Sequence, residues 1–472
     1  MKTPTLEPPR RPETVPVDPD FPQLKTACDP AQMIEVFRRH LKSVSGRPCL
    51  IQECVPFRFR FRQGGSRCVL QYTLHLVEPD SGRERSLSVT ALIYAGDGEA
   101  ERQYREILAT DPRSEIPETL LTFEPVSFIP ELQMLVEVFP YDRKLRGIPQ
   151  LMAGPVQELE PRLLASFGPG EWRAEKREVQ PARYRTELSA VLRYTLHARN
   201  AATSARATRR FFVKVYRGNR GEPTFQFLQS LSARPETEQE KYSVVRPVAY
   251  LRDLNSLVVE EAPGISLEQI ILEDKAGATE AAARQAARAV VAFNHTEILD
   301  APRSSPDEQM GELKRAAKLL HWSSPRLRAA VDNILRTIAA GLEDVPLALI
   351  HRDLKPAHIF LEGDRVILID LDSFALADPV RDPAHLLANI AAKADMSAAT
   401  PEQAGKAARA FADEYFAHVP DSWRKRLPIH YAGALLQEAA GIFKHVETGW
   451  QEKVSPLIDE AQRALAGGFK TT

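Results

Sequence analysis

Two acidic clusters in the C-terminal half of the chain are the residues best suited to carry out chemistry. The first lies in the string His351-Arg-Asp-Leu-Lys-Pro-Ala-His358, and the second is Asp370-Leu-Asp372. An aspartate beside an attacking hydroxyl can accept its proton, and further carboxylate oxygens can bind the divalent cations that bridge nucleotide phosphates. Asp353, Asp370 and Asp372 could therefore serve phosphoryl transfer.

Three short apolar runs, 348–350, 358–361 and 366–369, predict the strands that position these acids. Gly363-Asp364 separates the last two runs, and a Gly-Asp pair between β-favouring segments is typical of a two-residue hairpin turn. Asp353 then precedes the hairpin and Asp370 ends it. We therefore expect both carboxylates at the same edge.

A lysine inside an apolar strand is the next candidate. Strand alternation over residues 209–216 places Lys214 on the same face as Phe212 and Tyr216. A lysine in such a strand is costly unless an anion accompanies it. Lys214 is therefore predicted to hold the phosphates of a nucleotide, and the alternative is an edge-strand lysine in solvent.

These motifs together resemble those of the protein-kinase-like superfamily, and within it the aminoglycoside phosphotransferase and choline kinase branch. The resemblance covers roughly residues 180–470. It implies an α+β, bilobal protein-kinase-like fold that uses ATP and Mg²⁺. The same resemblance implies that Asp353 is the catalytic base and that Asp370 is the main metal ligand. It also implies a metal-binding role for His358, with Asp372 as a candidate for a second metal ligand.

Two residues of the catalytic string leave alternatives open. The family usually has Asn or Gln at the position of His358, and Mg²⁺ prefers oxygen ligands, so His358 either binds the metal through a water or simply packs. Lys355 either contacts the transferred phosphate or is a solvated loop lysine.

The resemblance also implies a nucleotide site. It pairs Lys214 with a glutamate of the next helix, for which Glu222 is the nearest candidate. The strand that begins at Ser256 and ends in a Pro-Gly turn resembles the hinge that binds adenine through backbone groups, here Glu260, Glu261 and Ala262. The turn 185–189 lacks glycine, so phosphate binding is expected to depend on Lys214 and the metal.

The segment after Asp372 separates the possible kinase classes. It enters a helical pattern after Asp378-Pro-Val-Arg-Asp382, which resembles the small-molecule branch and leaves no room for a peptide-docking segment. Asp382 either braces the catalytic loop, as in that branch, or caps a helix with Pro383 in its first turn.

The N-terminal part contains an internal repeat. Residues 69–75 match residues 191–197 at an offset of 122, and the same offset aligns Tyr94 with Tyr216. Leu92 occupies the position of Lys214, and no catalytic loop follows it. We therefore predict an extra, degenerate N-lobe-like domain that serves packing, capping or homodimer formation.

Composition fits a chain of several packed units. The net charge of −1 argues against general binding to nucleic acid or anionic membranes. The Pro-rich N-terminus lacks an apolar signal segment, which favours a cytoplasmic protein. The predicted domains are a disordered Pro-rich leader (1–24), the degenerate repeat (25–150), a kinase N-lobe with a leading helix near 155–160 (151–263), and a helical C-lobe with the catalytic loops (264–472).

The leading hypothesis is an ATP-dependent phosphotransferase that acts on a hydroxyl of a small molecule, such as a sugar or an aminoglycoside-like acceptor. Acidic and basic residues balance from residue 391 onward, so no acidic excess favours a polycationic acceptor. The alternative is a nucleotide-binding pseudokinase with a regulatory or scaffolding role. A Ser/Thr protein kinase, suggested by the spelling HRDLKP alone, is the third hypothesis.

Overall fold

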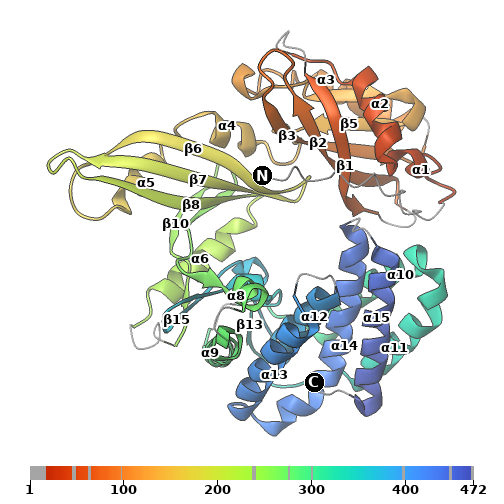
Figure 1. Cartoon of the computed structure of the whole chain (residues 1–472), viewed down its shortest axis with the longest axis vertical. Coiled ribbons are helices and arrows are strands. Elements are labelled where there is room, and N and C mark those ends of the chain that lie inside the picture. The colour runs from red at the N-terminus through yellow and green to blue at the C-terminus, as the bar shows by residue number, and fades with distance from the viewer. Residues whose placement is uncertain are drawn as a thin grey trace, which may run out of the picture. The chain divides into compact units, whose positions relative to one another are not determined.

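The structure, a computed structural model, is drawn in Figure 1. It describes residues 18–44, 49–61, 65–96, 98–235, 241–274, 277–298, 301–395, 399–445 and 449–468. Internal contacts divide the chain into two compact units. The first runs to Arg143 and includes Ile442–Trp450, and the second comprises Lys144–Gly441 and the residues from Gln451 onward.

The first unit is an antiparallel sheet accompanied by short helices. Its strands follow the order β1-β2-β3-β5-β4. Phe21 and Leu24 are buried, so the packed part of the chain begins before residue 25, and the predicted leader boundary at residue 24 is too late. Residues 1–17 of that leader lie outside the described residues. The elements are α1 (Leu24–Ala27), α2 (Pro30–His40), β1 (Leu50–Arg60), β2 (Arg67–Val77), β3 (Glu84–Tyr94), α3 (Glu99–Leu108), β4 (Val126–Ile129) and β5 (Met134–Val138).

The second unit begins with its own five-stranded antiparallel sheet, in the order β10-β11-β8-β7-β6. Lys214 lies on the central strand β8, where its Cα is paired with Leu257 on one side and Val191 on the other. The expected leading helix begins at Glu160, not near Pro155. The elements are α4 (Gly147–Ala153), α5 (Glu160–Ala165), β6 (Trp172–Arg185), β7 (Ser189–Asn200), β8 (Arg206–Tyr216), α6 (Gly221–Ser232), β10 (Pro247–Leu251) and β11 (Ser256–Glu260).

The two sheets have the same strand order, and their three central strands pair in the same register. Each of β2, β3 and β5 begins 122 residues before its counterpart β7, β8 or β11. Val69 pairs with Leu92 in the first sheet, as Val191 pairs with Lys214 in the second. Leu92 is fully buried. The first sheet therefore has an apolar side chain at the position where the second has its lysine.

The two acidic motifs follow short strands: residues 351–358 come directly after β13 (Ala348–Ile350), and Asp370 comes shortly after β15 (Arg365–Leu368). β14 (Ile359–Glu362) and β15 form the predicted hairpin, with Glu362 opposite Arg365 across the Gly363-Asp364 turn. They join β12 (Ile265–Ser266) and β9 (Ser243–Val244) in one sheet. A separate ribbon pairs β13 with β16 (Ala375–Ala377).

Helices build most of the rest of the second unit (Figure 1). Many of their alanines, leucines and aromatic residues are buried, and Ile442–Trp450, where α14 (Asp421–Lys444) ends and α15 (Trp450–Arg463) begins, belongs to the first unit. This agrees with the helical C-lobe predicted for residues 264–472. In the part of the chain that the structure describes, no helix has the length and apolarity needed to cross a bilayer. The other helices are α8 (Leu267–Glu273), α9 (Ala278–Asn294), α10 (Pro306–Ser323), α11 (Arg328–Gly341), α12 (Arg381–Asp395) and α13 (Pro401–Ala417).

Candidate active site

The strand lysine and the second acidic motif meet directly. Lys214 Nζ donates to Asp370 Oδ1 at 2.6 Å and to Asp372 Oδ1 at 3.3 Å. Tyr216 OH donates to the same Asp372 oxygen at 2.9 Å. Burial alone would lower the pKa of Lys214, but the two carboxylates outweigh it and raise that pKa. Lys214 is therefore a charged, anion-paired lysine and not an edge-strand lysine in solvent.

Asp370 adopts an unusual backbone conformation at the end of the hairpin. Its φ is +62°, in the left-handed region that aspartate tolerates better than most residues. Ile369, just before it, is fixed from both sides: its N–H donates to the carbonyl of His358 at 3.0 Å, and its carbonyl accepts from His351 Nε2 at 2.8 Å. These contacts hold the carboxylate of Asp370 toward Lys214.

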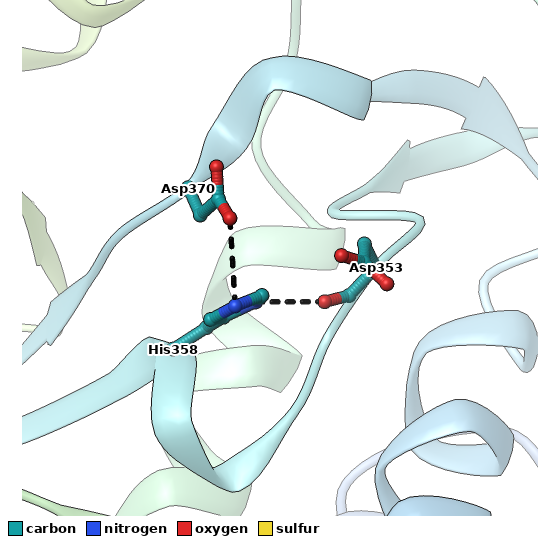
Figure 2. A group of neighbouring side chains, drawn as sticks. All are labelled: Asp353, His358 and Asp370. Carbon is teal, nitrogen blue, oxygen red and sulfur yellow. Dashed lines mark hydrogen bonds and ion pairs between the residues drawn. The ribbon is translucent and has the colours of Figure 1, made fainter. Parts of the chain in front are cut away.

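His358 lies between the two acidic motifs, as Figure 2 shows. Its Nδ1 is 2.8 Å from the backbone carbonyl of Asp353, and its Nε2 is 3.5 Å from Asp370 Oδ2. The ring stacks on His351 with a centroid separation of 5.5 Å. Burial lowers the pKa of His358 to about 4 despite the nearby Asp370, so the imidazole is neutral at pH 7.

The carboxylate of Asp353 lies close to a lysine and a histidine. Lys355 Nζ lies 2.9 Å from its Oδ1, and His385 Nε2 lies 3.9 Å from the same oxygen. Burial would raise the pKa of Asp353, but Lys355 and, to a smaller extent, His385 lower it. Asp353 is therefore ionised at neutral pH and able to accept a proton. Lys355 pairs with Asp353 and is not simply a solvated loop lysine.

Asp382 holds the catalytic loop in place. Its carboxylate accepts from the backbone N–H of His351 at 2.8 Å and of Arg352 at 2.9 Å, while Asn294 Nδ2 donates to it at 3.3 Å. Arg352 has a φ of +68°, a conformation that such contacts must stabilise. The bracing interpretation of Asp382 is confirmed, and the helix-cap interpretation is wrong.

A cavity of about 550 Å³ opens beside these groups. It has the size expected of a small-molecule or cofactor site. Lys214, His358, Asp370 and Asp372 lie in its wall, whereas Asp353 does not. The remaining lining residues are Arg183, Val191, Arg210, Phe212, Thr224, Leu228, Val245, Leu257, Val259, Glu260, Glu261, Ala262, Pro263, Gly264, Phe360, Ile369 and Leu371.

The predicted hinge forms one wall of this cavity. Glu260 N–H donates to the carbonyl of Arg246, and Glu261 N–H donates to that of Arg210, both at 3.0 Å. The N–H of Ala262 has no protein partner within the described part of the chain. Gly264 passes so close to the next hairpin that a Cβ would lie 2.1 Å from the carbonyl oxygen of Leu361. Of the three predicted hinge residues, only Ala262 thus offers an amide that is free to bind a ligand.

The predicted pair between Lys214 and Glu222 is wrong. Glu222 lies in the first turn of α6 and contacts Arg252 at 2.5 Å. The α6 residues that line the cavity are Thr224 and Leu228. Glu222 is the sole acidic residue of α6, so this helix has no carboxylate for Lys214. Asp370 and Asp372 take that role.

Two arginines of the cavity were not predicted. Arg183 on β6 and Arg210 on β8 both line it, and Arg210 contacts Glu261 at 3.3 Å. They add positive charge to the wall of the cavity, although Glu261 partly offsets that of Arg210. Their signal in the sequence was weak, because an arginine in an alternating strand is ordinarily a solvent-exposed residue.

One group of side chains could hold a divalent cation. A ligand atom of each of Asp353, His358 and Asp370 lies within 4.8 Å of the others. Two carboxylates and a neutral imidazole fit a divalent ion, although the nitrogen is a ligand that Mg²⁺ does not favour. Asp372 lies outside this group and is bound by Lys214 and Tyr216.

The β-sheet with its lysine, the hinge and the two acidic loops on a helical body together define a protein-kinase-like enzyme. The model of the phosphotransferase enzyme family matches residues 189–425, half of the chain, and the chain belongs to this family. The prediction of a phosphotransferase from the aminoglycoside phosphotransferase and choline kinase branch is thereby confirmed.

Solved structures of the same kind resemble the chain at low identity. The ADP-bound aminoglycoside phosphotransferase APH(2'')-Ib is 14% identical, with 66% of this chain and 99% of that chain covered and a TM-score of 0.40. A choline/ethanolamine kinase family protein from Mesorhizobium loti is 14% identical, with 62% and 92% covered and a TM-score of 0.41. No curated protein matches the chain.

Proposed function

We propose that the protein transfers the γ-phosphoryl group of ATP to a hydroxyl group of a small molecule. The observation that carries this proposal is the contact of Lys214 with Asp370, residues 156 positions apart in the chain, in the wall of the cavity. A strand lysine and a metal-binding aspartate that share one cavity are the parts a nucleotide triphosphate needs.

The cavity has walls suited to both ends of a nucleotide. Val191, Leu257 and Val259 are apolar and line it, and the free N–H of Ala262 can donate to a ring nitrogen of adenine. The phosphates would lie toward Lys214 because, of the cations in the cavity wall, its side chain is the least exposed. This placement leaves the turn 185–189, which has no glycine, a minor role.

Asp370, with His358 and Asp353, would hold the divalent cation, and Asp372 would join them once Lys214 turns to the phosphates. When bound, the cation neutralises the charge that develops on the phosphoryl oxygens. Asp353 accepts the proton of the acceptor hydroxyl. The hydroxyl oxygen forms a bond to the γ-phosphorus, the bond from that phosphorus to the bridging oxygen breaks, and ADP leaves.

A small acceptor agrees with the surroundings of Asp353. Only the short ribbon strand β16 and a turn separate Asp372 from helix α12, so the chain supplies no long peptide-docking segment there. His385 is on α12, and its Nε2 lies 3.9 Å from Asp353 Oδ1 and 4.0 Å from Glu438 Oε1. A polar acceptor could bind to these side chains while its hydroxyl reaches Asp353.

ADP formation with a panel of sugars, aminoglycosides and choline tests this function. The proposal expects ADP to form faster with one acceptor class and an equal amount of phosphorylated acceptor to appear. The alternative, a nucleotide-binding pseudokinase, is favoured by the glycine-free turn and by the missing carboxylate on α6. It expects ATP binding without turnover for the whole panel, and that result would overturn the proposal.

A further inference from the structure

The ring of His358 is oriented so that one nitrogen faces the acidic site with a free lone pair. Its Nδ1 lies 2.8 Å from the carbonyl oxygen of Asp353. Because a carbonyl oxygen can only accept, Nδ1 must carry the hydrogen, and Nε2 of the neutral ring then has none. This is the arrangement found in histidines that bind metals through Nε2.

The atom that faces Nε2 of His358 is Oδ2 of Asp370, which is also a hydrogen-bond acceptor. Nε2 lies 3.5 Å from Asp370 Oδ2, beyond the usual range of a nitrogen–oxygen hydrogen bond. Asp370 uses its other oxygen, Oδ1, for Lys214. Two lone-pair-bearing atoms that face one another at this distance are compatible with a cation between them, and Oδ2 is available to bind it (Figure 2).

The ring is also held firmly. Only 10% of the side chain of His358 is exposed, and the ring is stacked on that of His351 at an interplanar angle of 13°. His351 in turn contacts the carbonyl of Ile369, next to Asp370. A ligand fixed by such contacts loses little freedom when an ion binds, so the nitrogen is preorganised for that purpose.

We propose that His358 makes the cation site of this chain selective for a first-row transition dication such as Mn²⁺ over Mg²⁺. Mg²⁺ binds oxygen ligands almost exclusively, whereas imidazole nitrogen is a good ligand for the transition ions, whose affinities rise from Mn²⁺ through Co²⁺. Asp353 and Asp370 provide the oxygens that either ion accepts. The nitrogen therefore decides the preference.

This inference rests on the proposed function for its biological meaning, but metal binding without nucleotide can test it separately. The signal of free Mn²⁺ in electron paramagnetic resonance would report binding to the full chain, and Mg²⁺ would be added as competitor. We expect the wild type to bind Mn²⁺ about tenfold or more tightly than Mg²⁺. We expect His358→Asn to lower that ratio by about tenfold, within the range found for changes around bound metals.

His418→Asn is the matched control. Its Nδ1 also lies 2.8 Å from a backbone carbonyl, that of Glu414, but the residue is exposed and lies outside the cation group. It should leave the ratio unchanged. His358→Gln provides a second amide variant if His358→Asn does not fold.

Equal affinities of the wild type for the two ions, or the same ratio in the wild type and the amide variant, would overturn the inference. Both results leave the proposed phosphoryl transfer untouched. Mn²⁺ selectivity without any acceptor-dependent turnover would instead count against the proposed function alone.

Discussion

Lys214 Nζ lies 2.6 Å from Asp370 Oδ1. This contact links β8, the central strand of the second sheet, to the end of the β14–β15 hairpin. The ammonium also contacts Asp372, so two carboxylates share one cation. The pKa of Asp370 falls well below its usual range because Lys214 outweighs the effect of burial, whereas burial raises the pKa of Asp372. Lys214 therefore stabilises the acidic motif before any ligand binds.

Removal of this ammonium should destabilise the protein. Lys214→Met leaves Asp370 and Asp372 as unpaired neighbouring carboxylates, and we expect the free energy of unfolding at pH 7 to fall by about 1–3 kcal/mol, less than for a fully buried pair. Urea titration measures this change. Lys176→Met is the control, because Lys176 contacts Glu178 at the same 2.6 Å but on an exposed surface, and it should not change the stability. Equal losses in the two variants would contradict the interpretation.

Glu222 should have no part in nucleotide binding. It contacts Arg252, so we expect Glu222→Gln to bind ATP with unchanged affinity. Lys214→Met, in contrast, should weaken ATP binding by about tenfold or more, since it removes a charge-assisted contact to phosphate. Isothermal titration calorimetry with both variants makes the comparison. A similar loss in Glu222→Gln would show that the helix glutamate reaches the lysine when nucleotide is bound.

The stability of the helical part should depend on pH through Asp378. Arg426 donates to both of its oxygens, at 2.7 and 3.0 Å, and His430 Nε2 lies 3.0 Å from Oδ2. Burial would raise the pKa of Asp378, but these partners hold it well below its usual value. The stabilisation is therefore complete above the unfolded pKa and is lost as the pH falls toward the folded pKa.

Asp378→Asn tests this dependence. We expect the variant to be less stable than the wild type by about 2–4 kcal/mol at pH 7, because it leaves Arg426 without its anion. The difference should shrink below about pH 4, where the unfolded chain takes up a proton that the folded wild type does not. A difference that stays constant from pH 7 to pH 3 would mean that the carboxylate charge is not responsible.

The sequence predicted the parts of the site that lie in contiguous motifs. Asp353 and Asp370 were placed together correctly because a Gly-Asp turn between apolar runs defines a hairpin without further information. Lys214 was found because strand alternation fixes its face. Contacts between a helix and a sheet were harder to predict from the sequence, because they depend on how the helix is rotated about its axis against the sheet.

Glu222 illustrates that limit. A Cβ on Gly221 would lie 2.5 Å from the ring of Tyr216, so glycine permits close packing where α6 begins and fixes which side of the helix faces β8. That side presents Thr224 and not Glu222. The free amide of Ala262 was similarly hidden, since it depends on cross-strand hydrogen bonds of its neighbours.

The matching sheets lead us to propose that the first unit arose by duplication of the N-lobe. Leu92 replaces Lys214 in it, and the unit has no counterpart of the catalytic hairpin within its described residues. Homodimer formation through this unit and a cytoplasmic location stay predictions.

The most direct test of the account compares the wild type with Asp353→Asn in two assays, ATP binding by calorimetry and acceptor-dependent formation of ADP. We expect the variant to bind ATP in the absence of a divalent cation as the wild type does, because Asp353 does not line the cavity. With the cation present, it should form ADP about 10²–10⁴ times more slowly, because it cannot accept the hydroxyl proton. Equal rates of acceptor-dependent ADP formation in the two proteins would contradict the central claim.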